Sequence, residues 1–197
     1  MVYEHKTQQT RELLLNTLLD LVAEKDFEKI TIRDITEKAQ VNRGTFYRHF
    51  QDKMDLIEQK ERQIFADFEE LQSRFANKYY FSEKNGKFDL PTTDLIMILT
   101  YLYSQRRFMA VMLSQNGDLS FEHDFAEWFY QVIESSLKAG GNDVDTKHMK
   151  IVLHYQVAAM LGVIRYWFID EQATSTPEQI ANEIIQINRS GVWANLG

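Results

Sequence analysis

The sequence predicts an all-α fold of about nine helices with no sheet. Only 8 glycines and 2 prolines occur among 197 residues, too few for the tight turns that a β-sandwich or barrel requires. Apolar residues recur at helical spacing through most of the chain, and helix-starting or helix-breaking residues separate those segments. Hydrophobic residues make up 44% and charged residues 26%, which is typical of a globular chain and excludes wholesale disorder.

The amino-terminal helices each carry a local signal. A helix from about residue 7 to residue 24 has one apolar face, which holds Leu14, Leu18, Leu21 and Val22. Thr31 begins a second helix, and Asp34 three residues later forms an acidic variant of the capping box. The inward stripe of this second helix consists of Ile32, Ile35 and Ala39.

Further helices follow after short connections. Asn42 is a good N-cap for a helix over residues 43–50. Asp52 then caps a fourth helix, which runs from Lys53 to about Lys78. Residues 80–91 contain Ser, Asn, Gly and Pro and predict a loop. The remaining apolar periods predict helices over residues 92–104, 105–114, 121–138, 146–170 and 177–189.

Several functional classes are excluded or disfavoured. The chain has no cysteine, which excludes disulfides, thiolate metal sites and cysteine nucleophiles. The five histidines are scattered, and no HExxH, Walker A, GxGxxG or GxSxG motif occurs, so we expect no enzyme, no metal and no cofactor. No signal peptide is visible, and the most apolar stretch contains His154, Gln156 and Arg165, which would be costly in lipid. We expect a cytoplasmic protein without a membrane partner.

The charges are unevenly distributed. The formal net charge is −7, yet residues 1–62 carry 11 basic and 12 acidic side chains, whereas residues 63–197 carry 11 and 17. Within residues 29–53, six basic side chains stand against three acidic ones. A local patch, rather than the net charge, decides whether a protein binds phosphate groups. The six basic residues are equally compatible with solvated helix faces.

The helices over residues 31–39 and 43–50 form a helix-turn-helix pattern, because only three residues connect them. Phe46 and Phe50 are spaced i, i+4 and point inward. At about 100° per residue, the opposite face is polar or small. That outer face consists of Gly44, Thr45 and Arg48, with Tyr47 and His49 beside it. Guanidinium, hydroxyl and imidazole groups suit base edges and phosphates, and a glycine lets a helix approach a duplex closely.

The residues from Thr31 onward carry a more specific signal, made of the runs TIRDI, AQVNRGTFYRHF, DK and LI. They closely resemble the DNA-binding domain of the TetR family of bacterial transcriptional regulators, nearly continuously over residues 7–57. Residues 101–115 and 161–167 resemble, more loosely, one regulatory-domain subgroup of that family.

This resemblance implies two domains: a helix-turn-helix DNA-binding domain over residues 1–52, and a larger helical domain for ligand binding and dimerisation over residues 53–197. It also implies the DNA contacts. Phosphates and nearby bases would be contacted by Thr31, Arg33, Asn42, Thr45, Tyr47, His49 and Lys53, and base edges by Arg43 and Gly44. Geometry adds Arg48 to this set.

Two positions depart from the family pattern. The family usually has glycine where Gln40 stands and often has glycine where Asp26 stands. A left-handed conformation at Gln40 would cost about 1–2 kcal/mol. Neither change removes an expected DNA contact.

Residues 63–197 hold most of the aromatic side chains, interleaved with methionines. Such a set forms an ordinary core or an adaptable apolar pocket for a small molecule. The candidate pocket residues are Phe68, Tyr101, Met109, Met112, Phe129 and Tyr155.

The helix over residues 146–170 is apolar around nearly its whole circumference, so it must be buried on all sides. In so small a domain, we expect one side to meet the core and another to meet a second copy. The last helix shows the same trait, and the family resemblance also implies a four-helix dimer interface. The candidate interface residues are Val157, Leu161, Ile164, Phe168, Ile180, Ile184 and Ile187.

These observations predict a homodimeric transcriptional regulator, a repressor, that binds palindromic operator DNA and responds to a small-molecule effector. The alternative is a helical dimeric interaction protein that acts through another regulator instead of reading DNA itself. The acidic net charge and Gln40 leave room for this alternative. A small-molecule-binding enzyme ranks third, because no paired acid and base was found.

Overall fold

The computed structural model describes residues 2–75, 80–82, 87–89, 92–117, 119–139 and 143–191. Within these residues the fold is all-α, as predicted. The helices are α1 (Val2–Glu24), α2 (Ile32–Lys38), α3 (Arg43–His49), α4 (Lys53–Phe75), α5 (Thr92–Ser104), α6 (Arg106–Met112), α7 (Leu119–Ala139), α8 (Lys147–Arg165) and α9 (Pro177–Ser190). A 3-10 turn, η1 (Phe27–Lys29), precedes α2, and a π turn, η2 (Tyr166–Asp170), follows α8.

The segment predicted as a loop contains one local difference. Strands β1 (Tyr80–Ser82) and β2 (Lys87–Asp89) form a small antiparallel hairpin in which Phe81 is paired with Phe88. Gly and Asn between two short segments are compatible with a hairpin as well as with a loop, so the sequence did not separate the two. Lys78, the expected end of the fourth helix, lies outside the described residues.

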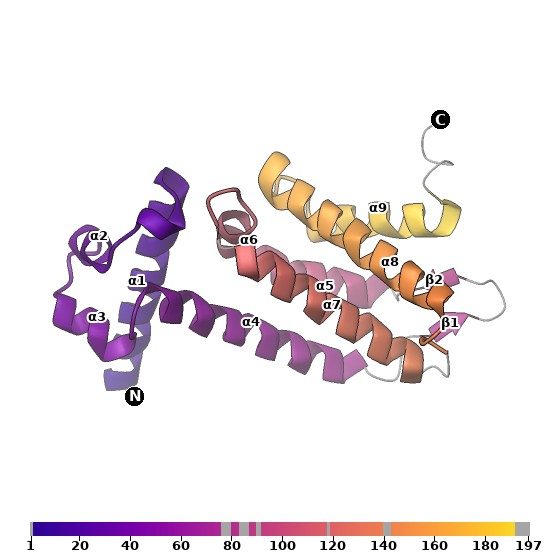
Figure 1. Cartoon of the computed structure of the whole chain (residues 1–197), viewed down its shortest axis with the longest axis horizontal. Helices are drawn as coiled ribbons and strands as arrows, with labels where there is room; N and C mark the ends of the chain where they lie inside the picture. Colours follow the sequence, from indigo (N-terminus) through magenta and orange to yellow (C-terminus); the bar gives the residue numbers. More distant parts are fainter. Residues whose placement is uncertain are drawn as a thin grey trace.

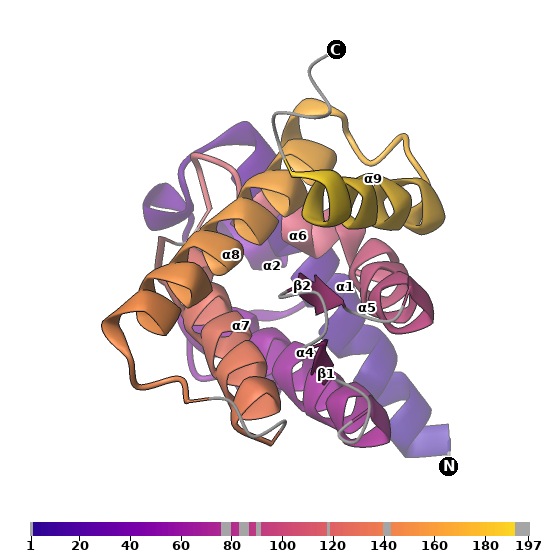
Figure 2. The ribbon, with the colours of Figure 1, turned by 90° about the vertical axis from the view of Figure 1, so that its right-hand side faces the viewer.

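The molecule is elongated, with a small head at one end (Figure 1). The head contains α1, α2 and α3, and α4 leaves it to run along the remaining helices. In the bundle, α9 packs against α5, and α8 packs against α7. The end-on view shows α8 and α9 together on the side of the bundle away from α4 (Figure 2). One helix, α4, therefore belongs to both parts of the molecule.

The head folds around the apolar face predicted for its first helix. Leu14 and Leu18 of α1 are completely buried, and so are Ile35 of α2 and Phe46 of α3. The first turns of α4 contribute Ile57, which is also fully buried. Burial of a side chain of this size contributes about 1.5–3 kcal/mol, so this cluster is what fixes the position of α3 on the head.

The predicted helix starts are confirmed by their hydrogen bonds. The Thr31 hydroxyl accepts from the Asp34 backbone N–H at 3.2 Å, and Asp34 Oδ2 accepts from the Thr31 N–H at 2.8 Å, which completes the capping box. Asn42 Oδ1 accepts from the Gly44 N–H at 2.8 Å at the start of α3. Pro177 occupies the first turn of α9, where its missing N–H has no cost.

The turn between α2 and α3 depends on one left-handed residue. Gln40 has φ = 55°, as expected for a position where the family usually has glycine. Immediately after it, the Val41 N–H donates to the Thr36 carbonyl at 3.0 Å and closes the turn. The hydrogen bond that closes the end of α2 thus compensates for the backbone strain at Gln40.

The structure corrects the residues expected at the dimer interface. Five of them are buried inside the single chain: Val157, Ile164, Phe168, Ile180 and Ile184. Leu161 and Ile187 are half-buried. A side chain that the chain itself already covers has almost no surface left for a partner. The five buried residues therefore belong to the core, whereas the placement of Leu161 and Ile187 at an interface stays a prediction. A different face of α8 is exposed.

Candidate nucleic-acid interface

The outward face of α3 is polar and accessible, because the two rings on its other face are buried. Phe46 is 0% exposed and Phe50 is 4% exposed, as the i, i+4 spacing predicted. The residues predicted to contact DNA divide into two groups by exposure. Asn42, Arg43, Gly44, Tyr47 and Arg48 are exposed, whereas Thr45 and His49 are half-buried. Helix α3 thus presents, on one face, the polar groups that were predicted to contact base edges and phosphates.

Arg43 and Tyr47 form a pair on this surface. The Arg43 guanidinium donates to the Tyr47 hydroxyl at 3.0 Å, and its central carbon lies 5.5 Å from the centroid of the Tyr47 ring. Tyr47 remains 48% exposed. A guanidinium held against a ring loses less side-chain freedom when it binds a base edge or phosphate. This pair is the most preorganised element of the surface.

His49 lies at the edge of the same surface, next to two cations. Burial lowers the pKa of His49, and the positive charges of Arg11 and Arg48 lower this pKa further. The imidazole is therefore neutral at pH 7 in the free protein. A nearby phosphate would act in the opposite direction, because a negative charge favours the protonated form.

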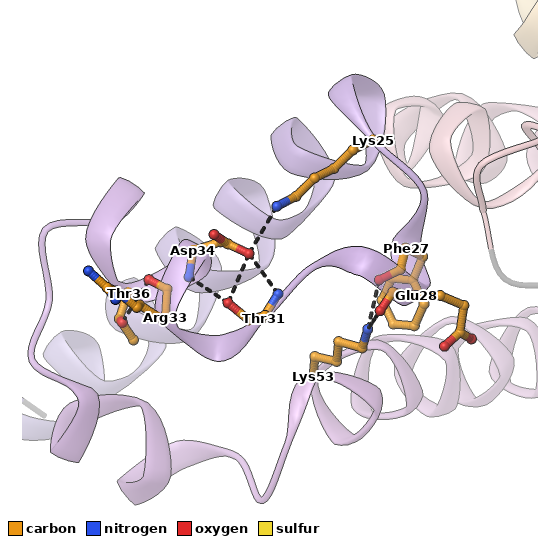
Figure 3. Close-up of polar contacts among 8 residues, drawn as sticks. All are labelled: Lys25, Phe27, Glu28, Thr31, Arg33, Asp34, Thr36 and Lys53. Carbon is orange, nitrogen blue, oxygen red and sulfur yellow. Dashed lines mark hydrogen bonds and ion pairs between the residues drawn. The ribbon is translucent and has the colours of Figure 1, made fainter.

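The start of α2 is held against α1 by charge. Lys25 Nζ lies 2.9 Å from Asp34 Oδ2, the same oxygen that accepts from Thr31 (Figure 3). The hydrogen bond from Lys25 and those from Thr31 lower the pKa of Asp34 to about 2. Arg33 lies one position away on the exposed side of α2, where its Nε donates to Glu37 at 2.6 Å. The pair with Glu37 uses Nε, so Arg33 can contact DNA through its terminal nitrogens without leaving Glu37.

Lys53 has partners within the head itself. Its ammonium donates to the Phe27 carbonyl at 2.7 Å and to the Glu28 carbonyl at 2.9 Å (Figure 3). It also lies 4.6 Å from the centroid of the Phe27 ring. These partners are on η1, not on the DNA-facing surface. We therefore interpret Lys53 as a residue that ties the start of α4 to the head. These contacts use two of the three ammonium hydrogens, so the phosphate contact of Lys53 stays a prediction.

We expect Lys53→Met to destabilise the protein without changing the salt dependence of DNA binding. The variant loses two hydrogen bonds from a charged donor, each of about 1.5–3 kcal/mol when fully formed, and partial exposure of Lys53 places the expected loss toward the lower end. Urea unfolding followed by circular dichroism measures this loss. If Lys53 instead held a phosphate, the salt slope of operator binding would flatten by about one unit and stability would be unchanged.

Two contacts between the head and the rest of the chain were not foreseen from the sequence. The Phe27 N–H donates to the Asn116 carbonyl at 3.3 Å, which brings the α6–α7 connection to η1. Arg107 at the start of α6 donates to Asn16 Oδ1 at 3.0 Å and also pairs with Asp20 of α1. Partners 87 and 91 residues apart leave no local pattern. In the same connection, glycine is required at position 117, because a Cβ there would lie 2.4 Å from the Met112 carbonyl oxygen.

Most of the candidate pocket residues lie in the interior. Phe68, Met109, Met112 and Phe129 are buried, and Phe68 contacts the Tyr101 ring with 4.9 Å between centroids. Tyr155 is the exception, since it is 63% exposed on α8. Tyr155 therefore cannot line an interior pocket of this chain.

Tyr101 supplies a polar group within this aromatic cluster. Its hydroxyl donates to Asp67 Oδ2 at 2.6 Å, from α5 to α4. Burial, followed by the hydrogen bond to this carboxylate, raises the pKa of Tyr101 above its ordinary value. The hydroxyl thus stays protonated at every physiological pH and remains a donor.

The outer face of α8 is apolar and exposed. Ile151 is 58% exposed and Tyr166 is 55% exposed, and residues of the same stripe are Val152, Tyr155, Ala158, Ala159 and Gly162. By length and composition, residues 147–170 could cross a membrane, and 33% of their most apolar stretch is buried. One such helix is weak evidence for a membrane span, and a stripe with small residues at its centre also fits close helix packing.

The fold and this surface define the class of the protein. A helix-turn-helix head with an exposed, basic second helix, followed by a separate helical bundle, is the architecture of a DNA-binding transcriptional regulator.

Comparison with known families and proteins identifies the group. The family described as bacterial regulatory proteins of the tetR family matches residues 14–59, and a transcriptional regulator C-terminal region of TetR type matches residues 91–190. The chain belongs to the TetR family of transcriptional regulators.

Individual relatives agree with this assignment. The HTH-type transcriptional regulator YxbF of Bacillus subtilis strain 168 is 28% identical over 184 residues, which are 93% of this chain and 45% of that protein. The chain thus spans less than half the length of this relative. The dhaKLM operon transcriptional activator DhaS of Lactococcus lactis strain IL1403 is 26% identical over 79% of this chain and 78% of its own length.

Solved structures show the same fold. The regulator FadR of Bacillus subtilis, crystallised in complex with stearoyl-CoA, has a TM-score of 0.61 at 12% identity. The match covers 92% of this chain and 98% of FadR. At this level of identity the likeness concerns the fold alone.

Proposed function

We propose that the chain acts as a homodimeric repressor that reads palindromic operator DNA with α3 of each subunit and is released by a small-molecule effector. Residues 1–52 would form the DNA-binding domain, and residues 53–197 the domain for effector binding and dimerisation. The observation that carries the proposal is the outward face of α3. Its exposed groups match those that contact DNA, and two buried rings fix its orientation.

The contacts on this face have different roles in the proposal. The Arg43–Tyr47 pair and Gly44 face base edges and supply sequence preference. The other expected groups contact phosphates, which supplies affinity and salt dependence; they are Thr31, Arg33, Asn42, Thr45, Arg48 and His49. Asn42 has its amide N–H₂ available, because only its oxygen is used in capping α3.

We expect Arg43→Ala to weaken operator binding by about 1–3 kcal/mol and to relax the preference at one base position in each half-site. The Tyr47 hydroxyl also loses its partner, so Tyr47→Phe is the matched control that removes this hydrogen bond alone. Titrations against operator variants, followed by fluorescence anisotropy, measure both effects. Unchanged affinity and unchanged preference would remove Arg43 from the interface.

We expect operator affinity to rise as pH falls from 8 to 6, and His49→Gln to lose much of this dependence. In the free protein, burial, Arg11 and Arg48 hold the pKa of His49 below its ordinary value of 6.5. In the complex, phosphates raise the pKa of His49, so binding takes up a proton and is favoured by acid. Anisotropy at constant ionic strength across this range measures the slope; a pH-independent wild type would place His49 away from the phosphates.

The proposed effector site is the aromatic cluster between α4, α5 and α7. It combines Phe68 with the Tyr101 hydroxyl and the Asp67 carboxylate, a mixture of apolar surface and a few polar groups that is typical of ligand pockets. An effector bound here would move α4, whose first residue, Lys53, is hydrogen-bonded to the head. The shift it produces is limited by the difference in its affinity for the two states.

The experiment that tests the whole proposal is the selection of genomic fragments by the purified protein, followed by a promoter-reporter assay. We expect palindromic sites, and lower reporter output when the protein is present. Higher output would make the protein an activator, as the name of DhaS states for that relative. Failure to enrich any fragment would favour the helical interaction protein that acts through another regulator.

A further inference from the structure

A groove crosses the junction between the head and the bundle. It consists of two hollows of about 250 Å³ and about 240 Å³. Both are lined by Glu12 and Leu15 of α1 and by Lys60 of α4. The second hollow extends to Arg107 and Phe108 at the start of α6. The groove is therefore bordered by the head on one side and by the regulatory helices on the other.

The charged side chains in the lining of the groove are mostly cationic. Arg11, Lys60 and Arg107 line it, against one carboxylate, that of Glu12. The two arginines are already held in place. Arg11 donates to Gln59 Oε1 and lies 5.5 Å from the centroid of the Phe50 ring, while Arg107 is fixed by Asn16 and Asp20.

Lys60 differs from the two arginines. Within the described part of the chain, its ammonium makes no hydrogen bond and no ion pair. Burial lowers the pKa of Lys60, and the carboxylates of Asp67 and Glu12 only partly offset this effect. A half-buried cation without a partner is unfavourable. An anion that reached it would form a charge-assisted hydrogen bond in a partly desolvated place, where such bonds are strong.

We propose that this junction groove binds a small anionic metabolite, whose carboxylate or phosphate group pairs with Lys60. A hollow of about 250 Å³ holds the volume of about eight water molecules at about 30 Å³ each, which suits an anion of similar size. Leu15 and Phe108 offer apolar contact to its carbon atoms. Since α1 and α4 both border the groove, the bound anion would bridge the head and the bundle.

The test uses the full-length protein and three probes at constant ionic strength: succinate, inorganic phosphate and uncharged succinamide. Isothermal titration calorimetry and thermal unfolding should both report saturable binding of an anion and none of succinamide. Succinate alone would indicate a carboxylate ligand, phosphate alone a phosphate ligand, and both a general anion site. Absence of saturable binding for both anions overturns the proposal.

Lys60→Met removes the charge, keeps an unbranched side chain, and should weaken anion binding at least tenfold. Lys6→Met, an exposed position of α1 outside the groove lining, is the charge-matched control and should change affinity less than twofold. Leu15→Trp fills both hollows and leaves Lys60 intact, so it should abolish binding even if Lys60→Met folds poorly. Equal anion affinity in the wild type and the Lys60→Met and Leu15→Trp variants would show that the anion binds elsewhere.

Discussion

Replacing Gly162 with tryptophan is expected to convert the proposed homodimer to a monomer while leaving the fold of each chain intact. Gly162 lies on the exposed stripe near the C-terminal end of α8, and a Cβ added there meets no atom within 4 Å. The chain itself therefore tolerates a large side chain at this position, and tryptophan has a higher helix propensity than glycine, by a few tenths of a kcal/mol. A partner packed against Ala158 and Ala159 would not tolerate it.

The consequence for DNA binding should be large. Two linked heads on one palindrome bind more tightly than either alone by a factor on the order of 10²–10⁴, so operator affinity should fall by that factor in Gly162→Trp. Analytical ultracentrifugation gives the oligomeric state, and anisotropy gives the affinity. Thr100→Trp, at an exposed position of α5, is the control for an added tryptophan and should stay dimeric. A Gly162→Trp protein that remains a dimer would move the interface away from this stripe.

Gly44→Glu is expected to give a protein at least as stable as the wild type that no longer binds its operator. A Cβ at Gly44 has one near neighbour, Asn42 Oδ1 at 3.4 Å, so nothing in the fold requires glycine here. Glutamate in the first turn of α3 also interacts favourably with the helix dipole, by about 0.3–1 kcal/mol. On the proposed interface, however, the same side chain fills the space next to the duplex and brings a negative charge to the phosphates.

The measurement for Gly44 combines thermal unfolding with operator titration. Opposite signs of the two effects would identify Gly44 as a contact position, since a general defect lowers stability and binding together. Gly44→Ala separates size from charge: we expect it to retain stability and to lose about 1–3 kcal/mol of binding, as for other contacts to base edges. A Gly44→Glu protein that still binds with wild-type affinity would show that α3 does not enter the groove.

The head was predictable from sequence because its signals are local. The capping box at Thr31, the N-cap at Asn42 and the i, i+4 rings of Phe46 and Phe50 each depend on residues a few positions apart. The left-handed conformation of Gln40 was anticipated from the family resemblance, because the family usually has glycine, which readily adopts a positive φ, at this position. These features are decided by backbone geometry before tertiary packing begins.

The sequence did not predict which residues contact each other across helices or which side of α8 faces the core. The apolar pattern of α8 predicts that both of its sides are covered but does not tell which one faces inward; Val157 and Ile164 turned out to face the core, and Tyr155 the outside. Likewise, the family position of Lys53 suggested a phosphate, whereas its ammonium found carbonyls 25 and 26 residues earlier in the chain. Such contacts depend on how the helices pack against one another, and a single sequence does not show this packing.

The hydrogen bonds that hold η1 have a consequence for how the sequence of this regulator can change during evolution. Lys53 and Asn116 both attach to main-chain atoms of the turn, at the carbonyls of residues 27 and 28 and the N–H of Phe27. Substitutions of the Glu28 and Lys29 side chains leave these hydrogen bonds in place. Those two positions can therefore change while the bundle and the head stay connected. The DNA-facing helix α3 and the helical bundle can then change in sequence separately, because the connection between them does not depend on those side chains.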